Sequence, residues 1–175
     1  MGFTVKIKFD MSKLQKIKRD SNKIFKTEIE WGWINGKAYN KSDINKRGGI
    51  PFALIAIRNE FGGYTKDNRT GKFIYIPSRP YFQQSIKDSV KDIAGSVGTV
   101  FTALLTGNEY KSHLQAISNS QVGILKASIA KNNMRPLHPK TVGIKDSTKQ
   151  WDDTGQLIKN ISSKVIYKRS DYKGD

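Results

Sequence analysis

The sequence contains no cysteine. This absence excludes disulfides, thiolate catalysis and zinc sites built on cysteine ligands. Histidine is scarce as well, since His113 and His138 are the only two, and neither has the spacing of a metal-binding motif. We therefore expect no metal and no cofactor.

Long apolar runs are also missing. The longest, at 97–105, is interrupted by glycine and threonine, and it is much shorter than the roughly 18 residues that a membrane span needs. We therefore expect no association with a membrane.

Acidic residues are few compared with basic ones, with 15 Asp and Glu against 31 Lys and Arg, for a formal net charge of +16. The basic excess is spread along the chain and does not form a tail. It suits contact with DNA or with an acidic protein surface, but an ordinary solvated surface explains it as well. The basic residues considered for such contacts are Lys16, Arg19, Lys23, Lys26, Lys46 and Arg47.

Strands are predicted where apolar and polar side chains alternate. Residues 3–9 indicate a half-buried strand with one apolar and one basic face. Residues 28–34 alternate in the same way, and Asn35-Gly36 is typical of a hairpin turn, so a return strand through 38–39 is expected. Further strands are expected at 73–76 and 161–167.

Helices are predicted where apolar residues recur at helical spacing. The first follows Asp10 or Ser12, either of which can cap it, and has a basic outer face. A short apolar helix over 51–61 ends at Gly62, which can take the left-handed conformation that closes a helix. Since little of its surface is polar, we expect this helix to be buried. Longer helices are expected over 80–105 and 109–131, a short one capped by Asp153 with Gln156 as capping-box partner, and loops over 40–49, 64–72 and 132–150.

Together these elements predict an α+β fold. It consists of a small, mostly antiparallel sheet packed against a long helix and one or two further helices, with long loops. The length fits a single domain over residues 1–168, followed by a flexible tail over 169–175. Trp31 and Trp33 in the second strand can anchor a core or a subunit contact, or can serve as stacking platforms for nucleic-acid bases.

Three short blocks stand out along the chain: IRNEFGG at 57–63, IPSRPYF at 76–82 and DTGQLIKNI at 153–161. Their order and spacing resemble the tail-completion and minor tail proteins of long-tailed bacteriophages, a family that includes neck and virion morphogenesis proteins. This chain departs from the family pattern in two places. Tyr81 turns the family's R-P-F into R-P-Y-F, and Trp151 stands where the family usually has proline and leucine leading up to the aspartate. The matching residues are Asn59, Glu60, Phe61, Gly62, Ile76, Pro77, Arg79, Pro80, Phe82, Asp153, Thr154, Gly155 and Leu157.

The resemblance implies a structural virion protein without enzyme activity. Such a subunit is made in the host cytoplasm and assembles as a ring, here a hexamer, at the head-proximal end of the tail. The implied partners are copies of itself, a tail-terminator or tail-tube protein, head-connector proteins, a tape-measure protein and packaged DNA.

The second block also predicts a rigid corner from its residues alone. Pro77 and Pro80 stiffen the passage from strand to helix, and Arg79 between them is expected to pair with Glu60 or an incoming carboxylate, or else to be merely exposed. The apolar residues Phe73, Tyr75, Phe82 and Ile86 are expected to pack around this corner against the 51–61 helix.

Two other functions compete with assembly. A DNA-binding protein would use the same basic residues on phosphates. A nuclease would use Asp152 and Asp153 to hold a metal, although capping of the following helix explains the same two residues.

Overall fold

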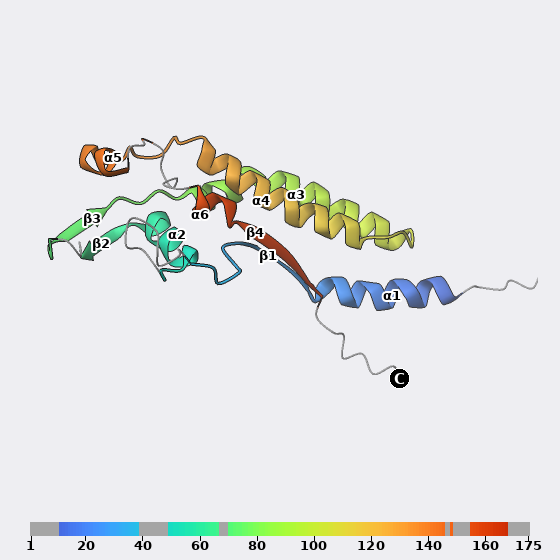
Figure 1. The fold of residues 1–175 in the computed structure, drawn as a ribbon. Helices are drawn as coiled ribbons and strands as arrows, with labels where there is room; N and C mark the ends of the chain where they lie inside the picture. Colours follow the sequence, from blue (N-terminus) through green and yellow to red (C-terminus); the bar gives the residue numbers. More distant parts are fainter. Residues whose placement is uncertain (1–10, 39–48, 67–69, 146–147, 149–154, 168–175) are drawn as a thin grey trace, which may run out of the picture.

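The structure is a computed structural model that describes residues 11–38, 49–66, 70–145, 148 and 155–167. It has the predicted α+β fold, with two separate two-stranded antiparallel sheets (Figure 1). The strand predicted over 3–9 and the tail over 169–175 lie outside the described residues.

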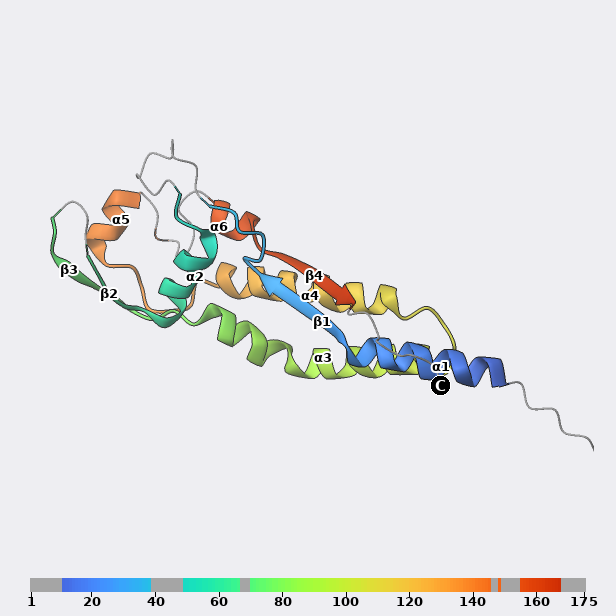
Figure 2. The same ribbon diagram turned by 90° about the horizontal axis from the view of Figure 1, so that it is seen from below.

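The largest unit is a pair of packed helices, α3 (Tyr81–Leu105) and α4 (Lys111–Ala130). Both were expected from the apolar spacing, and the turn through Gly107 ends α3 as predicted. Helix α1 (Met11–Phe25) lies along the C-terminal half of α3 (Figure 2).

One sheet pairs β1 (Thr27–Gly32) with β4 (Ser162–Tyr167), from Thr27 opposite Tyr167 to Gly32 opposite Ser162. The hairpin predicted at Asn35-Gly36 is therefore wrong. Residue 38 makes only an isolated bridge, to Pro51. The apolar side chains of β4 can cover the helices beside β1, which the weakly patterned residues after Gly36 cannot do.

The other sheet is a hairpin of β2 (Gly63–Lys66) and β3 (Phe73–Ile76), which follows helix α2 (Phe52–Phe61). A strand was not expected at 64–66, where charges obscure the strand preference of Tyr64 and Thr65. The described residues also include two short helices: α5 (Pro139–Lys145), inside a predicted loop, and α6 (Gln156–Lys159).

The core consists of two clusters at opposite ends of the α3–α4 pair. The two helices also bury serines at 85, 89, 118 and 128, and the hydroxyl of Ser128 bonds to Tyr81. The first cluster contains Phe52, Ala56, Tyr81, Leu125, Ile129, Leu157 and Ile161, and the second contains Val100, Ala103, Leu104, Tyr110, Leu114 and Ile117.

Candidate functional site

The first two sequence blocks meet in a joint between the end of α2 and the start of α3. The carboxylate of Glu60 accepts hydrogen bonds from the backbone N–H groups of Phe82 (2.9 Å) and Gln83 (2.8 Å). Pro80, at the N-cap position of α3, has no side chain that could do this. Glu60 thus satisfies N–H groups that have no partner within the helix, and its charge suits the positive end of the helix dipole.

Two further hydrogen bonds close the joint. The backbone N–H of Arg79 donates to the carbonyl oxygen of Asn59 (2.7 Å), and the hydroxyl of Ser78 donates to the carbonyl oxygen of Glu60 (2.6 Å). The side chain of Asn59 turns back and donates to the carbonyl oxygen of Ile55 (2.9 Å). The last turn of α2 is therefore fixed to the 77–80 corner by backbone as well as side-chain groups.

Gly62 lets the two segments approach closely. A Cβ atom at this position would lie 2.6 Å from the carbonyl oxygen of Ile76 and 2.6 Å from the backbone nitrogen of Ser78. Its φ of 70° and ψ of −155° belong to a region that only glycine occupies readily. The sequence predicted the positive φ, but not that the conformation differs from the left-handed helical one.

Arg79 is buried in the joint, with 4% of its surface exposed. Its Nε donates to the carbonyl oxygen of Arg135 (3.0 Å), and its terminal nitrogens donate to those of Pro77 (3.5 Å) and Pro136 (3.3 Å). Both the predicted ion pair with Glu60 and the alternative of an exposed arginine are wrong. The Glu60 carboxylate is already bound by the start of α3, so the guanidinium binds carbonyl oxygens instead.

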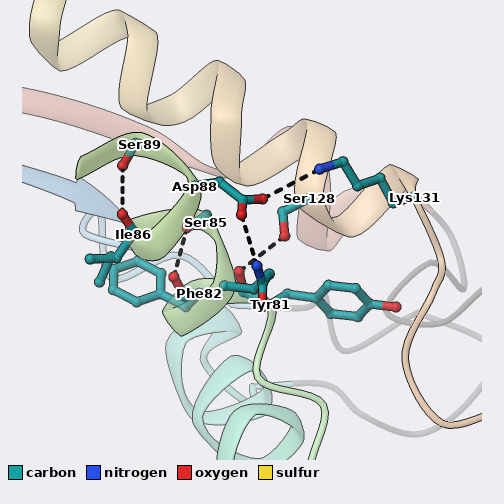
Figure 3. Close-up of polar contacts among 9 residues, drawn as sticks. Tyr81, Phe82, Ser85, Ile86, Asp88, Ser89, Ser128 and Lys131 are labelled. Carbon is teal, nitrogen blue, oxygen red and sulfur yellow. Dashed lines mark hydrogen bonds and ion pairs between the residues drawn. The ribbon is translucent and has the colours of Figure 1, made fainter. Parts of the chain in front are cut away.

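Tyr81 is fully buried beside this arginine. Its carbonyl oxygen accepts a hydrogen bond from the hydroxyl of Ser128 (3.2 Å; Figure 3). Its own hydroxyl accepts one from the backbone N–H of Met134 (3.4 Å). Burial raises the pKa of Tyr81, an effect that the Met134 bond and the charge of Arg79 oppose. Burial likewise lowers the pKa of Arg79, which Tyr81 opposes and Arg135 reinforces.

The late block reaches the same core through Leu157, which is buried. Its carbonyl oxygen accepts a hydrogen bond from the indole N–H of Trp33 (2.7 Å). The N-cap of α6 is Gly155, in a left-handed conformation and without a side-chain capping bond, so the predicted capping arrangement with Gln156 is wrong. Asp152, Asp153 and Thr154 lie outside the described residues.

The two tryptophans serve the core. Trp31 stacks on Phe82 with 6.0 Å between ring centroids, and Trp33 packs against the same cluster. Their interpretation as core anchors is therefore favoured over that of stacking platforms for bases.

Apolar side chains are exposed at the end of the molecule formed by α2, β2 and β3 (Figure 1). Helix α2 buries only Phe52, Ala56 and Glu60, and residues 73–75 of β3 are exposed, as is Ile86 of α3. The expected burial of α2 and of residues 73, 75 and 86 is therefore wrong. No described element covers these side chains. We call them together the hairpin patch; its seven residues, each 46% to 75% exposed, are Leu54, Ile57, Phe61, Tyr64, Phe73, Ile74 and Tyr75. Within the hairpin, Tyr64, Phe73 and Tyr75 share one face and Ile74 lies on the other.

Three of the six predicted basic residues, at positions 16, 19 and 23, belong to α1, and Lys26 follows it. Lys16 donates from its Nζ to the carbonyl oxygen of Gly107 (3.3 Å), and Arg19 lies 3.9 Å from Asp20. Both are exposed, as is Lys26, but Leu14 on the predicted apolar face is exposed too. The side chain of Lys23, and Lys46 and Arg47, lie outside what the structure describes.

The described residues offer little to a small ligand. No group of three or more His, Cys, Asp or Glu side chains among the described residues is arranged to hold a metal ion. A hollow of about 140 Å³ lies between α1 and the end of α3, whereas small-molecule sites usually measure roughly 300–1,000 Å³. No helix of the described part is long and apolar enough to cross a membrane.

The role of Glu60 is what the sequence analysis missed. A signal existed, because a long helix that starts after a proline lacks a capping side chain and needs an acceptor from elsewhere. Glu60 is the acidic residue of the preceding block. Comparisons of the chain with models of protein families, with curated proteins and with solved structures found no match.

Proposed function

We propose that this chain is a structural subunit of a long-tailed bacteriophage particle, a tail-completion or neck protein. In this proposal it has no enzymatic activity and forms a closed hexameric ring at the head-proximal end of the tail. There it helps to join the tail to the head, between tail-terminator or tail-tube subunits and the head connector.

The hairpin patch is the observation that carries this proposal. Its four aromatic and three aliphatic side chains expose on the order of 700 Å², since an aromatic side chain alone offers roughly 150–250 Å². Exposed apolar patches larger than a few hundred Å² mark interaction sites. One side of a standard protein–protein interface buries roughly 800 Å², so the apolar area exposed on α2 and on the two faces of the hairpin is comparable to that of an assembly surface.

The joint supports the same proposal. The residues that carry the resemblance, Glu60, Gly62 and Arg79 among them, fix the base of α2 to the start of α3. They thereby hold the β2–β3 hairpin at the end of the molecule away from most of the α3–α4 pair (Figure 1). A two-stranded hairpin is only marginally stable alone. Both the fixed joint beside it and a partner protein that covers its apolar side chains would stabilise it.

Electron microscopy of phage particles made without this chain tests the proposal. We expect tails with aberrant ends that do not join to heads, and rescue when the chain is supplied from a plasmid. Normal infectious particles in its absence would show that the proposal is wrong.

The net charge of +16 favours one alternative, a DNA-binding protein. Its affinity for DNA would fall steeply with salt, with a log–log slope of about −0.9 per phosphate contacted. A ring subunit is expected to bind free DNA weakly, so a salt titration with a short duplex separates the two functions.

A further inference from the structure

The β1–β4 sheet covers only part of the α3–α4 layer. Packed helices lie roughly 8–10 Å apart, whereas neighbouring strands lie roughly 4.7–4.9 Å apart. Two strands are therefore about as wide as one helix. Both strands contact α4, and β1 lies between β4 and α3 (Figure 2), so the surface of α3 beyond β1 has room for another strand.

That part of α3 carries an exposed apolar stripe. Residues at helical spacing share one face of a helix, and Ile86, Val90 and Val97 are 36%, 55% and 38% exposed. Phe82 and Ile86 lie on the same side of α3 (Figure 3), and Phe82 packs on Trp31 of β1. The stripe, which consists of Ile86, Val90, Ile93 and Val97, thus continues a face that β1 begins to cover.

Farther along α3 the same face is covered by α1. Phe101 and Leu104 continue the helical spacing. Leu104 belongs to the second core cluster, and Phe101 and Ile24 of α1 both pack against that cluster. The exposed stripe is therefore a gap between two covered parts of one helix face.

The edge of β1 that faces away from β4 borders this gap. Within the described part of the chain, β1 pairs with β4 alone. Ile29 and Trp31 pack toward the helices, so Glu28 and Glu30 lie on the outer face of the strand. Glu30 forms an ion pair (3.0 Å) across the sheet with Lys164. An edge strand of this kind is a template for one more strand.

We propose that residues 3–9 of a second copy of this chain add a strand to this edge of β1. The apolar face of that segment would cover the α3 stripe, and its lysines would lie beside Glu28 and Glu30. Opposite charges on neighbouring strands attract, and the outer face would then alternate Lys164, Glu30 and an incoming lysine. The segment provides Phe3, Val5, Ile7 and Phe9 on one face and Thr4, Lys6 and Lys8 on the other.

The reach of the chain excludes its own residues 3–9. Helix α1 runs away from β1, so that Met11 lies at the far end (Figures 1 and 2). The 15 residues of α1 span about 22 Å, and the ten residues before Met11 reach at most about 33–36 Å. A segment turned back along α1 would therefore bring only about three or four residues to β1.

This inference goes beyond the proposed function, since it concerns how copies join in any assembly. Because the chain has no cysteine, pairs of introduced cysteines can test it. Lys6→Cys and Lys8→Cys chains are each mixed with Glu28→Cys or Glu30→Cys chains and oxidised. Lys164→Cys serves as the matched control, because it lies on the same outer face one strand farther away.

Adjacent strands place Cα atoms about 4.5–5.5 Å apart, within the roughly 7 Å that a disulfide allows, whereas the control position would be about 10 Å away. We expect at least one mixture to give covalent dimers at a several-fold higher yield than the control. A synthetic peptide of residues 1–10 should lower that yield, and a scrambled peptide should not.

Two results would overturn the inference. One is a yield no higher than that of the control in all four mixtures, with far-UV circular dichroism showing that the variants are folded. The other is a doubly substituted chain, Lys6→Cys with Glu30→Cys, that closes on itself at high dilution, because the segment would then occupy its own edge.

Discussion

Glu60 is a buried residue whose carboxylate binds two backbone N–H groups and not a cationic side chain. Helix caps usually come from the residue just before the helix. Here the cap comes from the end of another helix, so capping α3 also fixes its angle to α2. The side chain is thus part of the joint's geometry as well as of its stability.

Replacing Glu60 with alanine should lower the free energy of unfolding by about 2–4 kcal/mol. Two partly buried N–H groups would lose their acceptor, and an unpaired buried donor costs about 1–3 kcal/mol. Urea unfolding followed by circular dichroism measures this. Glu109→Ala is the matched control: Glu109 accepts the N–H groups of Lys111 (2.9 Å) and Ser112 (2.8 Å) at the start of α4, but it is exposed. Water can replace that cap, so equal losses in the two variants would contradict the assigned role of Glu60.

Gly62→Ala should destabilise the chain by about 2–5 kcal/mol, the combined cost of a strained backbone and of displaced neighbours. Gly98→Ala should instead be neutral or stabilise by up to about 1 kcal/mol, since it lies inside α3 with open space around it. The same unfolding experiment compares the two. Similar results for both would mean that the close approach at Gly62 does not exist.

Elements with strong local signals were predictable from sequence, and their partners were not. Pro80 and the apolar spacing after it predicted α3, and the alternation over 161–167 predicted β4. The pairing of β1 with β4 could not be predicted, because it joins residues more than a hundred positions apart and the nearby Asn35-Gly36 turn suggested another partner.

The exposed patch was unpredictable for a related reason. Apolar spacing in α2 and β3 indicates surfaces whose burial is favourable. It does not indicate whether this chain or a partner provides the surface that covers them. The ion pair expected between Glu60 and Arg79 failed because backbone N–H and carbonyl groups compete for the same charges. Of the candidate site, the sequence predicted the residues of the joint but not their bonds.

Truncation of Phe82 and of Phe73 to alanine should change the stability of the protein by very different amounts. Phe82 packs on Trp31, so Phe82→Ala should cost about 3 kcal/mol, at the low end for a core phenylalanine. Phe73 is 73% exposed, so Phe73→Ala should change stability by less than about 1 kcal/mol. Urea unfolding of both variants checks this, and a large loss for Phe73→Ala would mean that the hairpin patch is already covered.

For the whole molecule, the net charge of +16 opposes the association of copies, whereas the exposed apolar surfaces favour it. Copies repel one another at low salt, and salt screens this repulsion, since the Debye length falls from about 10 Å at 0.1 M to about 3 Å at 1 M. Self-association should therefore strengthen as salt rises, as sedimentation velocity can measure. Weaker association at higher salt would instead indicate contacts dominated by opposite charges.

The decisive measurement is the fraction of head-joined tails seen by electron microscopy when purified chain is added to extracts of phage-infected cells that lack it. The wild-type chain should restore joining, and so should Thr99→Ser, a mild change at an exposed position of α3. A Phe73→Ser, Tyr75→Ser double variant that is folded but lacks the two aromatic side chains of β3 should not. Normal joining without any added chain would contradict the proposed function, and full rescue by the double variant would contradict the role of the hairpin patch.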